Sequence, residues 1–422
     1  MKILTVLMFL GAMSLICSQE DYFSPEPFLD ESQVVDMVEE EVEEEEILGT
    51  PVQRLAYSVS EFGYDLYRLM ASKDPSANVF LSPLSVAAGL SALSLGATST
   101  NKDILQRILN YNSLQDLDVH SAFKDLLTEI SMQPKQFKTV SRIYAKKRLK
   151  VQQAFVNQVA QYYGSRPKLV ANNMQRELSN MNQWLKIQTE GKISQGVRSL
   201  PARLSLLLLS AAHYQGKLVT KFNAANTMEK SFQLEYGQEV NVPTMSSQHY
   251  PLRYGYDSEL NCKIGLFRYM GDISLLIFLP SGLGQNMSAI EESLTPVFVH
   301  DLVSQLHLAK ASVSLPKLKL TTELELMEVL GEMNLKPLYS ATQLGKLSNS
   351  PASISSVTHV ASLTLAEGGQ EEAAPPLPNS PQFSLHFLVN RPFLMLLYDN
   401  PSGSLLHIAR VMDPRTLGQG RQ

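Results

Sequence analysis

The chain has 422 residues, 44% of them hydrophobic, so it is long and apolar enough to bury a large core. Its formal net charge of −5 at pH 7 is modest, and we expect no nucleic-acid partner. There are two cysteines, Cys17 and Cys262, and the first lies in an N-terminal segment that we expect to be removed. An internal disulfide in the mature chain is therefore excluded.

The first 18 residues have the pattern of a signal peptide. Lys2 precedes an apolar run from Ile3 to Cys17, which is too short to span a bilayer. We predict cleavage after Ser18, so that the mature chain begins at Gln19 and is secreted. A buried N-terminal strand is disfavoured because an acidic segment follows directly. No later stretch of the sequence predicts a transmembrane helix.

Residues 19–49 form an acidic segment. Thirteen acids and no Lys or Arg lie between Glu20 and Glu46. Such runs are usually flexible and solvated, an interpretation that we favour over a calcium site. Residues 47–422 carry 35 basic and 28 acidic residues, a net charge of +7. An acidic arm therefore precedes a mildly basic body.

The ordered body is predicted to begin with a helix at Pro51. Thr50 is a suitable N-cap, Pro51 suits the first helical position, and Gln53 completes a capping box. Apolar residues then recur every three or four positions to Leu69, which predicts one buried helical face. A second helix, predicted from Ser82-Pro83 to Gly96, is apolar or small nearly all round and should be buried.

Three later segments predict strands that are buried on both faces. They are continuous apolar runs too short for typical helices: Leu204–Ala212, Leu275–Leu279 and Phe393–Tyr398. No Gly/Ser-rich linker divides the body, so we predict one α+β domain over residues 50–415, followed by a short tail, 416–422. Residues 366–384 begin AEGGQEEAAPPLPNSP, a composition that predicts a long exposed loop.

The sequence contains none of the common catalytic or cofactor-binding motifs. There is no HExxH, GxSxG, phosphate loop, complete dinucleotide glycine motif or Cys/His pairing of zinc type. Cys262 is expected to be a buried, inert thiol. We therefore predict a protein that is not an enzyme, with no cofactor and no metal.

Three blocks resemble the serpin family. They are residues 78–87 (NVFLSPLSVA), the segment containing Asn182-Gln-Trp184 and Thr189–Ile193, and Asn390-Arg-Pro-Phe393 with Gly403, Arg410 and Pro414. The resemblance runs from about residue 50 to 415. It implies the serpin fold, with early helices, large mixed sheets and an exposed reactive-centre-type loop near the C-terminus. Ser210 and Leu218 depart from it, since serpins usually have Asn and Trp there.

Further blocks, such as residues 62–68 (FGYDLYR) and 290–295 (IEESLT), are similar to a non-inhibitory branch of the family. That similarity implies a monomeric, matrix-associated factor of antiangiogenic and neurotrophic type. Its implied partners are collagen, heparin, heparan sulfate or hyaluronan-like glycosaminoglycans, and cell-surface receptors. The implied receptor-active region is residues 79–121, although much of it is predicted to be buried helix. A loop-inserting protease inhibitor and a small-molecule carrier are the alternatives.

A basic cluster is the candidate heparin site. Five cations lie within nine residues, and such clusters attract polyanions. The resemblance points to Lys146 and Lys147, with Arg148 and Lys150 as stand-ins for a third cation and Arg142 nearby. A solvated strand face explains the pattern equally well. For collagen, the resemblance points to three acids, Asp257, Glu259 and Asp301.

The loop sequence argues against protease trapping. In inhibitory serpins the cleaved loop inserts as a central strand, whose alternate side chains face the core. The hinge here reads Glu367, Gly369, Gln370, Glu372, Pro375 and Pro376, with Ala373-Ala374 the only match to the inhibitory pattern. Burying Glu372 unpaired would cost several kcal/mol, and proline is excluded from central strands. Asn286, in the sequon Asn286-Met287-Ser288, is the predicted N-glycosylation site.

Overall fold

The computed structural model describes residues 49–98, 100–114, 117–234, 237–282, 287–340, 344–368 and 385–415. Residues from Thr50 onward form one compact unit. Its α-helices are α3 (Pro51–Lys73), α4 (Pro83–Ser94), α5 (Thr100–Ile108), α6 (Val119–Ser131), α7 (Gln153–Tyr163), α8 (Met174–Gln188), α9 (Ser288–Ser293), α10 (Pro296–Gln305) and α11 (Met327–Leu330). Short helical turns are η1 (Tyr111–Leu114), η2 (Lys147–Leu149), η3 (Ala224–Asn226), η5 (Gly331–Leu335) and η6 (Lys336–Tyr339).

The strands form two sheets. They are β1 (Val79–Leu81), β2 (Phe137–Lys146), β3 (Lys168–Val170), β4 (Leu206–Tyr214), β5 (Met228–Gln233), β6 (Glu239–Asp257), β7 (Cys262–Tyr269), β8 (Ile273–Pro280), β9 (His307–Pro316), β10 (Leu318–Glu325), β11 (Ile354–Leu365), β12 (Leu385–Leu388), β13 (Phe393–Asp399) and β14 (Ser404–Val411). The mixture of helices and sheets confirms the predicted α+β class.

Local sequence determines the start of helix α3. The hydroxyl of Thr50 accepts the backbone N–H of Gln53 at 3.2 Å, and the Gln53 side-chain oxygen accepts the N–H of Thr50 at 2.9 Å. This capping box satisfies two of the amide groups that a helix start leaves without intrahelical partners. The predicted cap and helix are confirmed. Helix α4 is also confirmed, and all twelve of its residues are buried.

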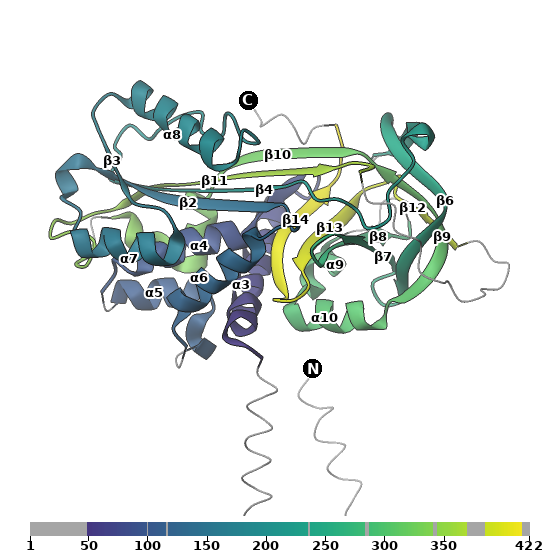
Figure 1. Ribbon diagram of the computed structural model, residues 1–422, viewed down its shortest axis with the longest axis horizontal. Coiled ribbons are helices and arrows are strands. Elements are labelled where there is room, and N and C mark those ends of the chain that lie inside the picture. The colour runs from purple at the N-terminus through teal and green to yellow at the C-terminus, as the bar shows by residue number, and fades with distance from the viewer. Residues whose placement is uncertain are drawn as a thin grey trace, which may run out of the picture. The chain divides into compact units, whose positions relative to one another are not determined.

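The smaller sheet has five strands in the order β10-β11-β4-β2-β3. Helix α8 covers one of its faces, with Trp184 and Leu185 packed among side chains of β2 and β4. The early helices, α4 among them, lie on the opposite face, as Figure 1 shows below the sheet. Strand β4 is buried along its whole length. Because both faces are covered, the run predicted from residue 204 can be uniformly apolar.

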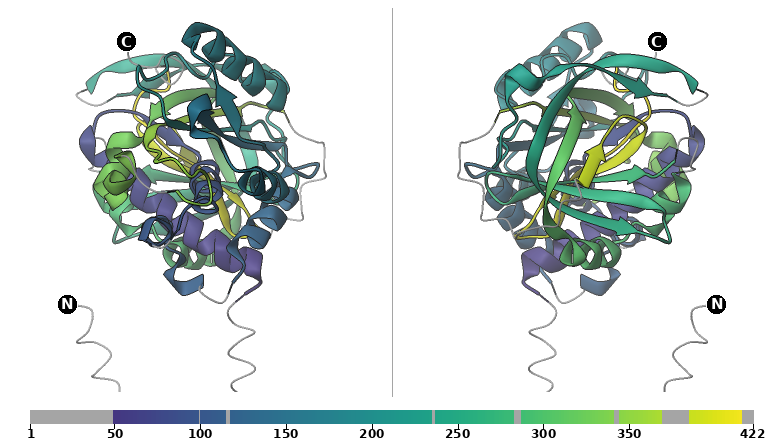
Figure 2. Two further views of the ribbon diagram at one scale, coloured as in Figure 1. Left: turned by 90° about the vertical axis from the view of Figure 1, so that its left-hand side faces the viewer. Right: turned by 90° about the vertical axis from the view of Figure 1, so that its right-hand side faces the viewer.

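The larger sheet has nine strands, ordered β1-β14-β13-β8-β7-β6-β9-β12, with β5 paired to β6. Strands β8, β13 and β14 form its buried centre. The teal β6 and green β9 lie side by side in the right-hand view of Figure 2, in agreement with their antiparallel pairing. Lys317 is the single residue between β9 and β10, so it joins the larger sheet to the smaller.

Candidate functional site

The first candidate site is the seam at which a serpin loop would insert. Strands β4 and β11 are parallel neighbours, paired from Leu206 with Ile354 to Tyr214 with Leu363. No strand separates them, so the five-stranded sheet is closed. An inserted strand would have to break this pairing along its length.

Glu367, the first predicted hinge residue, is fixed at the end of this seam. One of its carboxylate oxygens lies 3.0 Å from the ammonium of Lys317 and accepts the Thr227 hydroxyl at 2.8 Å. Its backbone carbonyl accepts the N–H of Phe222 at 3.1 Å, and the Gly368 carbonyl accepts the N–H of Leu218 at 3.0 Å. Burial opposes ionisation, but these hydrogen bonds and the Lys317 charge outweigh it and lower the pKa of Glu367.

Sequence reasoning missed Lys317 and Thr227 as partners of the hinge. They lie 50 and 140 residues before Glu367, so local patterns carried no signal for either contact. The other predicted hinge residues, Gly369, Gln370, Glu372, Pro375 and Pro376, lie outside the described residues. So does Asn286, the predicted glycosylation site.

A buried histidine joins the two sheets beneath the seam. The His359 Nε2 accepts the backbone N–H of Ser82 at 3.0 Å, so the neutral ring carries its proton on Nδ1, which lies 2.9 Å from the Ser210 hydroxyl. The Ser82 hydroxyl in turn donates to the carbonyl of Leu406 at 2.7 Å. Burial lowers the pKa of His359 to about 3. Ser210, a departure from the family pattern, is therefore accommodated by a direct hydrogen bond.

A second histidine, His407, is fully buried nearby on β14. Its ring lies between Phe80 and Phe137, at centroid distances of 5.0 and 5.5 Å. Neither ring nitrogen makes a hydrogen bond of normal geometry within the described part of the chain. Burial, reinforced by the neighbouring His359, lowers its pKa to about 3. Both histidines are consequently neutral at physiological pH.

The predicted basic cluster surrounds one buried leucine. Lys146 ends β2, Lys147 and Arg148 begin η2, and Lys150 follows with a positive φ of 48°. Leu149 is buried between them and its carbonyl accepts the Ser348 hydroxyl, so the turn is anchored to the body. Lys147, Arg148 and Lys150 are exposed and Lys146 is half-buried. None of the four forms an ion pair with a described residue.

The cluster differs from the sequence prediction in two respects. The guanidinium of Arg142 lies 4.2 Å from the Trp184 ring centre, and its Nε donates to the Ser165 hydroxyl at 3.3 Å. Stacked in this way, Arg142 is not a member of the solvent-facing group. Lys168 joins it instead, because β3 pairs with β2 and places this exposed lysine opposite Tyr144, diagonally beside Lys146.

The three predicted acids belong to the nine-stranded sheet and the helix beside it. Asp257 ends β6, and its Oδ1 accepts the N–H groups of Glu259 and Leu260 at 2.9 Å each, which closes the turn into β7. Glu259 is exposed in that turn. Asp257 therefore has a structural role in addition to any binding role.

Asp301 is exposed on helix α10, whose C-terminal end packs on β6. Arg253 donates to the carbonyl of Leu306 at 3.0 Å, and a Cβ at Gly255 would come within 2.6 Å of the Leu306 side chain. Residues 253, 255 and 257 alternate onto one strand face. The strand and helix that carry these acids are therefore in contact, and this strand belongs to a different sheet from the basic cluster.

Cys262 is fully buried at the start of β7. Burial, with a smaller contribution from Asp257, raises the pKa of its thiol to about 12. The predicted burial of Cys262 is confirmed, and the raised pKa disfavours the thiolate, which is the reactive form. Across the described residues, no group of three or more His, Cys, Asp or Glu side chains could hold a metal ion. Within the same residues, no helix has the length and apolar character needed to cross a membrane.

Comparison with known proteins agrees with this fold. The family model for serpins, serine protease inhibitors, matches residues 57–414. The chain belongs to the serpin family. It is 39% identical over 375 residues to pigment epithelium-derived factor of Homo sapiens, covering 88% of this chain and 90% of the relative.

Two further similarities have lower sequence identity. Alpha-2-antiplasmin of Mus musculus is 32% identical over 366 residues, covering 86% of this chain and 73% of that protein. Among solved structures, mouse protein Z-dependent protease inhibitor superposes with a TM-score of 0.79 at 25% identity, covering 86% of this chain and 98% of the other. These similarities confirm the serpin fold and the family inferred from sequence.

Proposed function

We propose that this chain is a secreted, non-inhibitory serpin that acts as an extracellular binding and signalling factor. The loop sequence is the observation that carries the proposal. Counted from Glu367, its inward positions would be Gln370, Glu372, Ala374, Pro376 and Pro378. Insertion would bury the Glu372 carboxylate without a partner and would place donorless prolines in a central strand.

The contacts at the seam between β4 and β11 support the same conclusion. Strands β4 and β11 are fully paired, and Glu367 is held by Lys317 and Thr227 at their end. An inserting strand would have to break the β4–β11 pairing. The alternative, inhibition by loop insertion, keeps support from the inhibitory relatives, but within the loop only Ala373-Ala374 fits it.

The binding function is assigned to two separate surfaces. The cations of residues 146–150, with Lys168, would bind heparin-like or hyaluronan-like glycosaminoglycans. Asp257, Glu259 and Asp301 would bind Lys and Arg side chains of collagen. Because the surfaces belong to different sheets, both ligands can be held at once, which suits a matrix-associated protein that presents itself to cell-surface receptors.

The receptor-active region implied by the family resemblance is restricted by burial. Helix α4, which forms the first part of residues 79–121, has no exposed residue. A receptor could therefore contact only the later part, mainly α5, where Lys102, Asp103 and Arg107 are exposed.

A protease challenge tests the proposal. Trypsin-, chymotrypsin- and elastase-like proteases are incubated with the protein at equimolar ratio, beside an inhibitory serpin as control. We expect cleavage after which each protease remains fully active, as with any substrate. A protease complex that survives SDS, as the control should give, would establish the inhibitory alternative instead.

A further inference from the structure

One cavity of the described structure is lined by residues that belong neither to the two proposed binding surfaces nor to the seam between β4 and β11. It has a volume of about 910 Å³, is open on one side, and is lined by the C-terminal half of α3, the end of α5, helix α9, and the ends of β8 and β14. This volume lies within the range of about 300–1,000 Å³ that small-molecule sites occupy.

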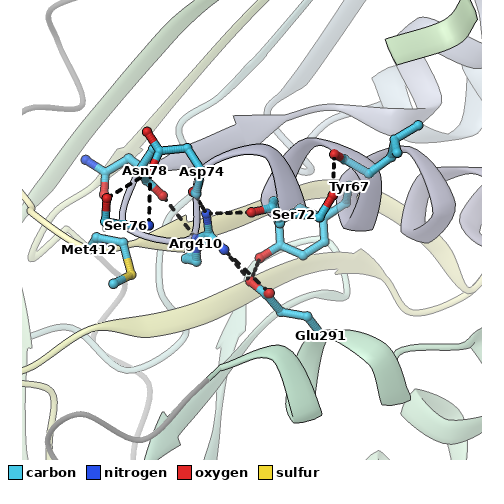
Figure 3. Close-up of polar contacts among 11 residues, drawn as sticks. Tyr67, Ser72, Asp74, Ser76, Asn78, Glu291, Arg410 and Met412 are labelled. Atoms are coloured by element: carbon cyan, nitrogen blue, oxygen red, sulfur yellow. Dashed lines mark hydrogen bonds and ion pairs between the residues drawn. The ribbon is translucent and has the colours of Figure 1, made fainter. Parts of the chain in front are cut away.

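The cavity floor is a closed polar network, shown in Figure 3. The Arg410 guanidinium contacts the Glu291 carboxylate at 3.1 Å, and Tyr67 donates its hydroxyl to the same oxygen at 2.7 Å. Arg410 also donates to the backbone carbonyls of Ala71, Asp74 and Ala77. Charge and hydrogen-bonding capacity are matched here, so the floor is structural and leaves no group for a ligand.

Arg68, which also lines the cavity, likewise has partners for its charge and its hydrogen bonds. It forms an ion pair with Asp65 at 2.5 Å and donates to the carbonyl of Leu294 at 2.7 Å. Arg391 differs from both. Its Nε donates to the Pro280 carbonyl at 2.7 Å and its Nη1 to the Asn390 side chain at 3.0 Å, both of them neutral acceptors.

Arg391 is therefore a half-buried cation with no carboxylate in ion-pair range among the described residues. Burial lowers the pKa of its guanidinium. Its Nη2 has no described partner, and Arg391 is one of the residues that line the cavity. A guanidinium with a free edge is suited to a carboxylate, which it can bind in a bidentate manner.

The rest of the lining is mixed, with Arg107 and Glu292 beside a group of apolar side chains. Met287 and Met412 are buried to all but 6% and 7% of their surface, and Leu69, Ile108 and Met333 also line the cavity. Methionine side chains adapt their shape to flexible apolar ligands. A flexible chain could follow this surface while its head group remains at Arg391.

From this arrangement we propose that the cavity binds a small amphipathic carboxylate of the long-chain fatty-acid type, with Arg391 anchoring the carboxylate and the three methionines contacting the chain. The site is independent of the proposed collagen and glycosaminoglycan surfaces, and binding there requires no loop insertion.

Titration with cis-parinarate, a fluorescent fatty acid, followed by displacement with oleate, tests the site. We expect one saturable site per chain and displacement by oleate but not by methyl oleate, which has the same chain without the charge. Arg391→Gln should weaken binding at least about tenfold, since hydrogen bonds between charged groups are the strong ones. Arg391→Lys should retain most of the affinity.

Arg253→Gln is the matched control. Arg253 is likewise half-buried and donates to backbone carbonyls, but it lines a different cavity of about 430 Å³. The Arg253→Gln variant should bind cis-parinarate with the affinity of the unaltered protein. Met333→Glu is a second test that leaves the Arg391 contacts intact, and its carboxylate should repel the ligand. Absence of saturable binding, equal displacement by methyl oleate, or unchanged affinity in Arg391→Gln and Met333→Glu would each overturn the proposal.

Discussion

The ammonium of Lys317 lies 3.0 Å from a carboxylate oxygen of Glu367. This ion pair connects the junction between β9 and β10, where the two sheets meet, to the first residue of the loop hinge. Lys317 is held in place by its own backbone N–H, which donates to the Pro243 carbonyl at 2.8 Å. The contact therefore fixes the start of the loop at the end of the seam between β4 and β11.

Glu367→Gln and Lys317→Gln should each lower the melting temperature slightly. Both side chains are partly exposed, at 16% and 39%, so solvent screens their attraction. We expect a coupling free energy of about 0.5–1 kcal/mol, as for other partly exposed pairs. Chemical denaturation of the two single variants and the double variant measures it. If the changes in the free energy of unfolding of the two single variants add up to that of the double variant, the two charges do not interact.

His407→Phe should make the protein less sensitive to acid. The folded-state pKa of His407 is lowered to about 3, below its unfolded value of about 6.5, so the unfolded state binds the proton first as pH falls. Stability is therefore fully present above pH 6.5 and is lost as pH decreases. At pH 5 the cost is about 2 kcal/mol for this group.

Melting temperatures of the wild type and His407→Phe between pH 7.5 and pH 4.5 test this. The two curves should diverge as pH falls, with the variant the more stable at the acid end. The variant should still lose some stability, because burial also lowers the pKa of His359. Parallel curves would mean that His407 is protonated in the folded protein.

Lys146→Ala with Lys147→Ala should weaken heparin binding about tenfold, since exposed charge contacts contribute roughly 0.5–1 kcal/mol each. Retention on immobilised heparin over a salt gradient measures the loss, and added salt should weaken binding in all variants. The control is Lys310→Ala with Lys319→Ala, which removes two exposed lysines from other strands. Equal losses of heparin affinity in the two double variants would show that heparin responds to the net charge of the protein and not to this cluster.

Asp257→Asn with Asp301→Asn should weaken collagen capture about three- to tenfold and leave heparin retention unchanged. Asparagine keeps the oxygen that accepts the N–H groups of Glu259 and Leu260, so the turn should survive the change. Asp103→Asn with Asp125→Asn removes two exposed acids elsewhere and should bind collagen normally. Collagen capture by the double variant at wild-type strength would exclude these acids as the site.

Sequence predicted those features that depend on neighbours along the chain. The Thr50–Gln53 capping box spans three residues, and the apolar runs of β4, β8 and β13 report burial on both faces of a strand. The basic cluster could also be recognised from local sequence, since its four cations lie within five residues.

The features that sequence could not predict depend on distant pairings. Arg142 was named as a cation near the basic cluster, but its contact with Trp184 forms only because α8 folds over β2. Lys168 joins the cluster through the pairing of β3 with β2. The cavity at Arg391 gathers residues from α3 to β14, and no periodicity within any one element indicates it.

The melting temperature before and after cleavage of the C-terminal loop tests the non-inhibitory assignment most directly. The protein is cut within residues 370–384 by a limiting amount of protease, the cut is located by mass spectrometry, and both forms are melted side by side. Since Glu372 and the prolines oppose insertion, no strand is gained, and we predict a shift of at most about 3 °C. An increase of more than about 10 °C in the cleaved form would show that the loop had entered the sheet between β4 and β11, and would contradict the assignment.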